Sequence, residues 1–143
     1  MAENIAAIST TVEKTNRILS EIEREMNWQG RPDEALLAMR VVLHTLRDRL
    51  PVNAAASLGA QLPELVRGIY YEGWAPARVP VKMNREEFLD EIRRHFIYAR
   101  VEGLDVERIT STVLETVALH LDHGEVEKIK AALPKGIAAL MPG

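Results

Sequence analysis

Histidines and carboxylates, the side chains best suited to bind a metal, gather in one short segment of the chain. His120-Leu121-Asp122-His123-Gly124-Glu125 contains two imidazoles and two carboxylates, which are ligands for zinc and related ions. His120 and His123 flank a predicted helix break, and no second group of such residues supplies the remaining ligands of a closed site. Asp122 and Glu125 have the spacing of a capping box, which explains them without a metal. We therefore predict no metal site and no cofactor.

His44 is the other candidate for chemistry. At 100° per residue it shares one strip of a predicted helix with Leu37, Val41 and Asp48, opposite the main apolar face. A general base needs a partner and a substrate cleft, and the sequence identifies neither. We therefore favour a partly buried, hydrogen-bonding histidine over a catalytic one. The apolar part of the strip needs a cover, and we expect either a second protomer or an N-terminal extension with Ile5, Ile8 and Val12.

Several aromatic side chains lie together within the segment Tyr70-Tyr71-Glu72-Gly73-Trp74. Tyrosine and tryptophan combine a large apolar body with a polar group, which suits ligand pockets and protein interfaces. The same rings could instead hold the following linker against the core, with a turn at Gly73. Both alternatives stay open. The candidate binding residues, for a ligand or an interface, are Leu37, Val41, His44, Tyr70, Tyr71, Glu72 and Trp74.

The remaining sequence offers no catalytic motif. It has no glycine-rich phosphate loop, no Gly-x-Ser-x-Gly motif and no paired carboxylates in an apolar setting, so we expect the protein not to be an enzyme. The net charge of -3, with acids and bases interspersed, disfavours nucleic acid as a partner. There is no cysteine, no signal-peptide pattern and no apolar run long enough for a bilayer. We expect a cytoplasmic protein with no membrane partner.

Helical spacing of apolar residues extends through most of the 143 residues, and glycine and proline interrupt it at intervals. We predict an all-α helical bundle of about eight helices, including short ones. Asn84 with Glu87, and Asp105, have the residue types of helix N-caps. The predicted helices cover 4–26 (one helix or two in line), 33–50, 54–61, 64–70, a stretch beginning after Asn84, 106–121 and 126–133.

The second half of the chain repeats the pattern of the first. At an offset of 71, residues 42, 43, 45 and 50 match residues 113, 114, 116 and 121, and the Leu62-Pro63 pair matches Leu133-Pro134. Repeats of this size are typical of stacked helical units that share a core. We predict a single helical domain over 1–143, with two tandem related helical repeats. It divides into an N-terminal helical extension (1–14), repeat one (15–71), a linker (72–84) and repeat two (85–143).

Three strings of residues point to a known family: Leu43-His44-Thr45-Leu46-Arg47-Asp48-Arg49-Leu50-Pro51, Leu58-Gly59-Ala60-Gln61-Leu62-Pro63 and Arg67-Gly68-Ile69-Tyr70-Tyr71-Glu72-Gly73-Trp74. With Thr15-Asn16-Arg17 and Ala132-Leu133-Pro134-Lys135-Gly136, the chain resembles the bacterial family called domain of unknown function 2267, from about Thr15 to the C-terminus. The resemblance implies a small helical protein, and it supports a cytoplasmic location. It implies no activity, because the family has no established chemistry.

These observations favour a non-enzymatic module for protein interaction or self-association, such as a homodimer. The reason is that repeat one has an apolar surplus at Leu37 and Val41 without accompanying catalytic groups. The alternative is a small-ligand binding protein. Its pocket would lie at the junction of the two repeats, lined by Tyr70, Tyr71, Trp74 and His44.

Overall fold

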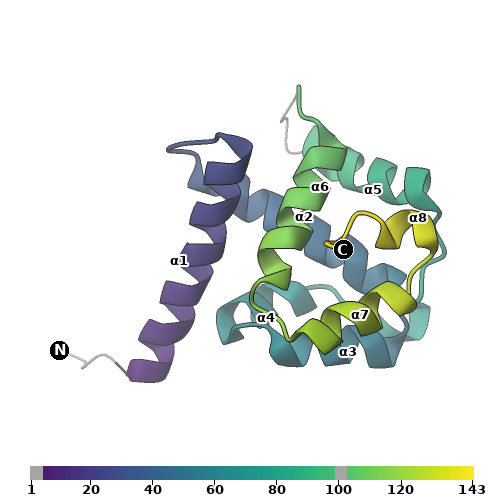
Figure 1. Cartoon of the computed structure of the whole chain (residues 1–143), viewed down its shortest axis with the longest axis horizontal. Helices are drawn as coiled ribbons and strands as arrows, with labels where there is room; N and C mark the ends of the chain where they lie inside the picture. The colour runs from purple at the N-terminus through teal and green to yellow at the C-terminus, as the bar shows by residue number, and fades with distance from the viewer. Residues whose placement is uncertain (1–4, 99–102) are drawn as a thin grey trace.

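The computed structural model describes residues 5–98 and 103–143, and within them it contains α-helices and no strand (Figure 1). The prediction of an all-α helical bundle is therefore confirmed. The helices are α1 (Ala6–Met26), α2 (Pro32–Arg49), α3 (Val52–Gln61), α4 (Glu64–Tyr71), α5 (Arg85–Tyr98), α6 (Val106–Ala118), α7 (His123–Ala131) and α8 (Lys135–Ala138), with a 3-10 turn at Pro76–Arg78 in the linker.

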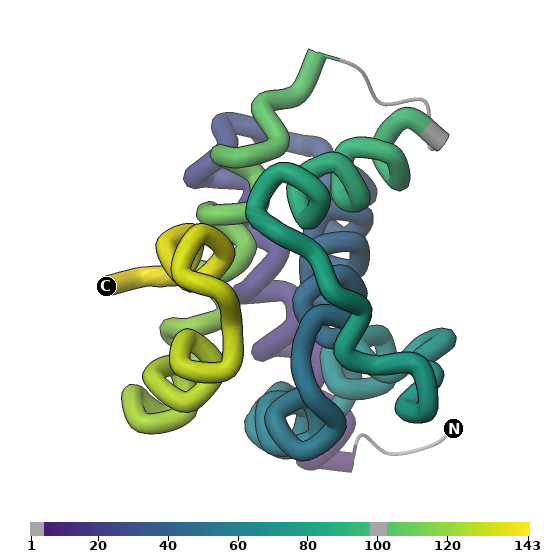
Figure 2. The backbone as a smooth tube through the Cα atoms, turned by 90° about the vertical axis from the view of Figure 1, so that its right-hand side faces the viewer, coloured from purple at the N-terminus to yellow at the C-terminus, as the bar shows by residue number. Residues whose placement is uncertain are grey.

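Helix α2 lies at the centre of the bundle, where it packs against α1, α4, α5 and α6 (Figure 2). A helix surrounded on several sides must be apolar on more than one face. The sequence of α2 meets that requirement, and Pro32 at its first position suits a helix start because its missing N–H needs no partner there. Its buried residues are Ala35, Ala38, Met39, Val41, Val42, Leu43, Thr45, Leu46 and Arg47.

Helix α1 is buried along only its second half. Ile18, Ile22 and Met26 enter the core, whereas none of residues 5–14 is buried. Figure 1 shows this first half extending away from α2 and α6 toward the N-terminal end. The helix ends at Asn27, whose left-handed backbone (φ 59°) is a common helix terminus. The predicted start at residue 4 lies outside the described residues.

The helices of the two halves follow the same order. Helices α3 and α7 begin at residues 52 and 123, and α4 and α8 begin at 64 and 135, so both pairs keep the offset of 71. Helices α3 and α7 pack against each other, and buried apolar residues of both halves form one core cluster. The last helix is shorter in the second half. The division into repeats stays a prediction.

Two of the predicted N-caps form and one does not. Asn84 Oδ1 accepts a hydrogen bond from the Glu87 amide at 2.9 Å, and Asp105 accepts one from the Arg108 amide at 3.2 Å. The capping box predicted at Asp122 and Glu125 is wrong, because the Glu125 carboxylate turns toward α3. There it accepts a hydrogen bond from the Ser57 hydroxyl at 2.9 Å.

The boundaries of two predicted helices are also different. The helix predicted through residue 121 ends at Ala118, because 119–121 form turns. Helix α7 begins at His123, three residues before the predicted start. Within the described residues, no helix combines the length and apolar character needed to cross a membrane.

Candidate functional site

The residues proposed from the sequence come together between α2 and α4. His44 Nε2 donates a hydrogen bond to the Ile69 carbonyl oxygen at 2.6 Å. Arg47 Nη1 donates to the carbonyl oxygens of Tyr70 and Glu72 at 2.7 and 2.6 Å. These two side chains, three residues apart on α2, satisfy carbonyl groups at the C-terminal end of α4, where the helix dipole favours positive charge. The structure thus brings His44 and the segment 70–74 together in one cluster.

The structure bears on both covers expected for the strip on α2: the N-terminal extension does not supply one, and a second protomer over Leu37 stays a prediction. Val41 is only 6% exposed in the single chain, so no second protomer is needed to bury it, and Leu37 is half-buried. The side chains of Ile5, Ile8 and Val12 in the extension are 62%, 58% and 41% exposed, so they do not supply the cover. Helix α4 packs on α2 and meets the strip at His44.

The aromatic side chains pack within the same cluster. Tyr70 is fully buried and its hydroxyl donates to the Ala55 carbonyl oxygen at 2.7 Å. The rings of Tyr70 and Tyr71 meet edge to face at 5.0 Å, and Tyr71 and Trp74 lie 5.3 Å apart. Tyr71 fills the space beside the Gly59 backbone. These contacts hold the start of the linker against α3 and α4, and a binding role for the rings stays a prediction.

Burial shifts the pKa values of two side chains in the cluster, His44 and Tyr70. Desolvation lowers the pKa of His44 below its ordinary value, with Arg47 acting in the same direction, while the bond to Ile69 and the carboxylates of Glu72 and Asp48 oppose it. Because Nε2 faces a carbonyl oxygen, we assign the ring hydrogen to that nitrogen, which leaves Nδ1 as an acceptor. Burial likewise raises the pKa of Tyr70, so its hydroxyl remains a donor.

A cavity of about 390 Å³ lies between α2 and α5, at the junction of the two halves. Its lining includes His44 but not Tyr70, Tyr71 or Trp74, so only one of the four residues expected there takes part. Many of its polar groups already have partners: Arg94 donates twice to Glu91, each at 2.6 Å. The lining residues are His44, Thr45, Asp48, Val81, Met83, Glu87, Glu91, Arg94 and His95.

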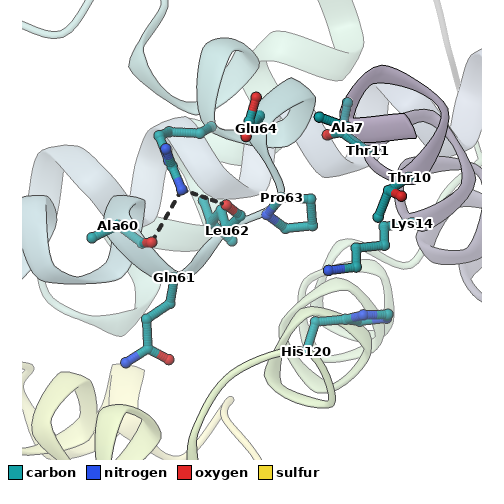
Figure 3. A pocket seen from close by; sticks show the side chains of 11 residues that line it. Ala7, Thr10, Thr11, Lys14, Ala60, Gln61, Leu62, Pro63, Glu64 and His120 are labelled. Atoms are coloured by element: carbon teal, nitrogen blue, oxygen red, sulfur yellow. Dashed lines mark hydrogen bonds between the residues drawn. The ribbon is translucent and has the colours of Figure 1, made fainter. Parts of the chain in front are cut away.

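A second cavity, of about 400 Å³, separates the first half of α1 from the turn between α3 and α4. Figure 3 shows Lys14 and His120 on one side and residues 60–63 on the other. Arg67 fixes that turn by donating to the carbonyl oxygens of Gly59, Ala60 and Leu62, at 2.8, 3.1 and 3.1 Å. Thr11 Oγ1 accepts from the Leu65 amide at 2.8 Å, which ties α1 to the start of α4.

Next to this tie, an apolar surface is exposed. It consists of Ile5, Ile8 and Val12 on α1 and Leu65 on α4, which is 43% exposed; we call it the α1–α4 patch. The sequence analysis identified Ile5, Ile8 and Val12 but offered them as a possible cover for the strip on α2. These residues precede the region that resembles the family, so the fold shared with the family does not require them.

Sequence reasoning missed two buried charged residues, Arg47 and Glu125. Arg47 lies in the most family-specific string, which was the available signal for a structural role. Glu125 had no such signal, because its partner Ser57 is distant in the chain. Within the segment 120–125, the side chains of His120 and Glu125 diverge: His120 lies 3.7 Å from Glu21 of α1, while Glu125 faces α3.

Fold and surface together define a small all-helical protein with cavities between its helices and an amphipathic helix that projects from the bundle. The chain belongs to the DUF2267 family of uncharacterized conserved proteins, whose pattern matches residues 15–140. No curated protein matches it. The match begins after the exposed half of α1, so Ile5, Ile8 and Val12 lie outside the region shared with the family.

Proposed function

We propose that the protein is a non-enzymatic interaction module that self-associates through the α1–α4 patch. The observation that carries this proposal is that Ile5, Ile8 and Val12 form one helical stripe with no core beneath it. Contiguous apolar residues exposed on a monomer commonly mark an interface. The patch replaces Leu37 and Val41 as the proposed contact surface, because Val41 is buried within the single chain and Leu37 is half-buried.

The proposed occupant is a second copy of the chain. An antiparallel pair of α1 helices about a two-fold axis near Ile8 places Ile5 of one copy opposite Val12 of the other, so one stripe covers its equivalent. The stripe also lies outside the family match, which favours a partner that this chain itself supplies. No side chain of residues 5–14 is buried, and a short helical stretch with so few tertiary contacts is marginal in water, so pairing would stabilise it.

The expected affinity is low. In the dimer, covering the exposed parts of Ile5, Ile8 and Val12 on both copies contributes about 5–9 kcal/mol. This total scales the value for full burial, about 1.5–3 kcal/mol per side chain, by the exposed fractions. Association costs about 4–15 kcal/mol in lost translational and rotational freedom. The two terms are of similar size, so the dimer should form only at high concentration.

Sedimentation equilibrium over a wide concentration range tests the proposal. The average mass should rise above the monomer mass of 16.1 kDa as concentration increases. Ile8→Glu should hold the protein at the monomer mass, and Thr10→Glu, on the opposite side of the same helix, should not. A wild-type protein that remains monomeric at about 500 μM, where an interface worth roughly 4.5 kcal/mol would be half occupied, would contradict self-association.

A second candidate function is the binding of a small ligand in the cavity between α2 and α5. Its support is the volume of about 390 Å³ together with the unassigned acceptor Nδ1 of His44 at its wall. A fragment screen by NMR should give shifts centred on Thr45, Glu87 and His95. Loss of those shifts in His44→Asn, with retention in His123→Asn, would support this candidate, and hits scattered over other helices would contradict it.

A further inference from the structure

A larger cavity, of about 600 Å³, lies between α1, α6 and α7, away from the α1–α4 patch and the α2–α5 cavity. This volume is within the range of small-molecule sites. Its walls are mostly apolar, and they include Ala118, Leu119, Leu121, Val126 and Pro142. Leu119 is strongly exposed at this position. The cavity therefore has the apolar lining that an organic molecule requires.

Two threonines of α6 give this cavity unused hydrogen-bonding groups. Thr112 and Thr116 line it and are only 9% and 4% exposed. Buried threonines elsewhere in the fold return their hydroxyl to the carbonyl one turn earlier, as Thr110 does to Val106 at 2.8 Å. Among the described residues, neither Thr112 nor Thr116 has a hydrogen-bond partner for its hydroxyl. Because both residues line the cavity, a ligand bound there can donate to or accept from these hydroxyls.

The charge of the lining is strongly acidic. Glu21 and Glu25 of α1, Glu115 of α6 and Glu127 of α7 contribute four carboxylates, and Arg24 contributes one permanent cation. Arg24 is largely exposed and lies 4.0 Å from Glu25, so it offsets that carboxylate rather than those deeper in the cavity. Glu21 Oε2 is shielded from solvent and has no hydrogen-bond partner within the described residues, and its nearest basic group is His120 Nε2 at 3.7 Å, beyond hydrogen-bond distance.

We propose that this cavity binds a small organic cation, an amine with an apolar body. The ammonium group would donate to the Glu21 carboxylate and the Thr116 hydroxyl, which are acceptors, while the apolar body covers Leu121 and Val126. Carboxylates on three helices attract a cation and repel an anion of the same shape. Recognition then depends on charge and not only on hydrophobic fit.

Three probes of similar shape test this assignment: 2-phenylethylamine, 2-phenylethanol and phenylacetate. We expect the amine to bind in an NMR titration of the labelled protein, with shifts grouped on residues 21–25, 112–121 and 123–127. The alcohol and the acid should bind at least about tenfold more weakly, the difference that one charge-assisted hydrogen bond provides. Equal binding of amine and alcohol, or no binding of the amine at about 10 mM, a concentration that reveals interactions of roughly 2.7 kcal/mol, would overturn the proposal.

Matched variants then locate the contacts. Glu21→Gln should weaken amine binding by about 10-fold or more and Thr116→Val by about 2- to 10-fold, the ranges for charged and neutral hydrogen bonds. Two control variants should leave the affinity unchanged: Glu13→Gln, at an exposed position of α1, and Thr110→Val, on α6. Neither residue lines the cavity. If the variants at Glu21 and Thr116 bind the amine like wild type, the assignment is wrong. The probe comparison on wild-type protein stands even where a variant fails to fold.

This test is independent of self-association. The α1 stripe and the cavity share no residue, so Ile8→Glu should abolish dimerisation and leave amine binding intact. Failure of one proposal would not affect the readout of the other.

Discussion

Arg47 donates a 2.7 Å hydrogen bond to the carbonyl oxygen of Tyr70 from a position that is only 3% exposed. A charged side chain at the centre of a helical bundle is costly unless hydrogen bonds compensate its burial. Arg47 makes three such bonds: to Tyr70, to the Glu72 carbonyl oxygen at 2.6 Å and to Asp48 at 2.9 Å. It therefore connects the central helix α2 to the end of α4.

Replacing Arg47 by methionine should lower the free energy of unfolding by about 2–4 kcal/mol. The apolar side chain leaves two carbonyl groups without donors, and each unpaired buried group costs about 1–3 kcal/mol. Urea denaturation followed by circular dichroism measures the change. Arg40→Met is the control: Arg40 bonds to Glu72 at 3.0 Å on the surface, and exposed pairs contribute about 0–1 kcal/mol. Equal losses in the two variants would refute a special role for Arg47.

Gly59→Ala should destabilise the protein although alanine is the better helix former. A Cβ at residue 59 would overlap the ring of Tyr71, and overpacking costs about 1–3 kcal/mol. Alanine at Gly68 of α4, where a Cβ meets no neighbour, should instead stabilise by about 0.5–1 kcal/mol. Thermal unfolding of both variants compares them directly. A destabilised Gly59→Ala protein should recover in part when Tyr71 is also changed to leucine.

His44 should make stability depend on pH. Its pKa in the folded protein is lowered, chiefly by burial, whereas in the unfolded chain it is near the ordinary 6.5. Below that value the unfolded state binds the proton more readily, so stability falls as the pH decreases through 6.5 toward the folded pKa. Above 6.5 the contribution is fully present. In His44→Asn, the loss of stability between pH 7.5 and pH 5 should be smaller than in wild type.

NMR titration of the imidazole resonances gives the direct measurement. The pKa of His44 should lie below 6.5, because burial disfavours the charged imidazolium. A pKa for His44 at or above 6.5 would mean that the bond to the Ile69 carbonyl and the nearby carboxylates outweigh burial.

Ser57→Ala should weaken the contact between α3 and α7. The buried Glu125 carboxylate accepts its shorter bond from Ser57 at 2.9 Å, and Gln61 lies farther away at 3.5 Å. Loss of a hydrogen bond to a charged group costs about 1.5–3 kcal/mol. Ser20→Ala, at an exposed position of α1, should change stability by less than about 0.5 kcal/mol. Similar effects of the two substitutions in urea denaturation would show that Ser57 contributes little.

Local signals account for what the sequence predicted well. Periodic apolar residues and the caps at Asn84 and Asp105 act within one or two turns of a helix, so they are visible in the chain itself. The cover of Val41 was not visible in this way. It depends on how the neighbouring helices pack around α2, and that packing involves residues far apart in the chain, such as His44 and Ile69.

The candidate site shows the same limit. The sequence analysis grouped His44 with Tyr70, Tyr71 and Trp74 as the lining of one pocket, but in the structure these residues contact α2, α3 and α4, and only His44 reaches the cavity. Glu125 was assigned to a local cap, yet its carboxylate bonds to Ser57 at a distance of 68 residues in the chain. Long-range partners of this kind are decided by tertiary packing, which outweighs a modest local preference.

The lack of buried side chains in residues 5–14 has a consequence for how the protein can diverge. Substitutions there do not disturb the core that residues 15–140 share with the family. Selection can therefore change the outer surface of α1 without a penalty in folding, while the central helix α2, enclosed by four others, leaves little freedom for change. The first turns of α1 are thus the part of the described chain in which new contacts can arise at the lowest mutational risk.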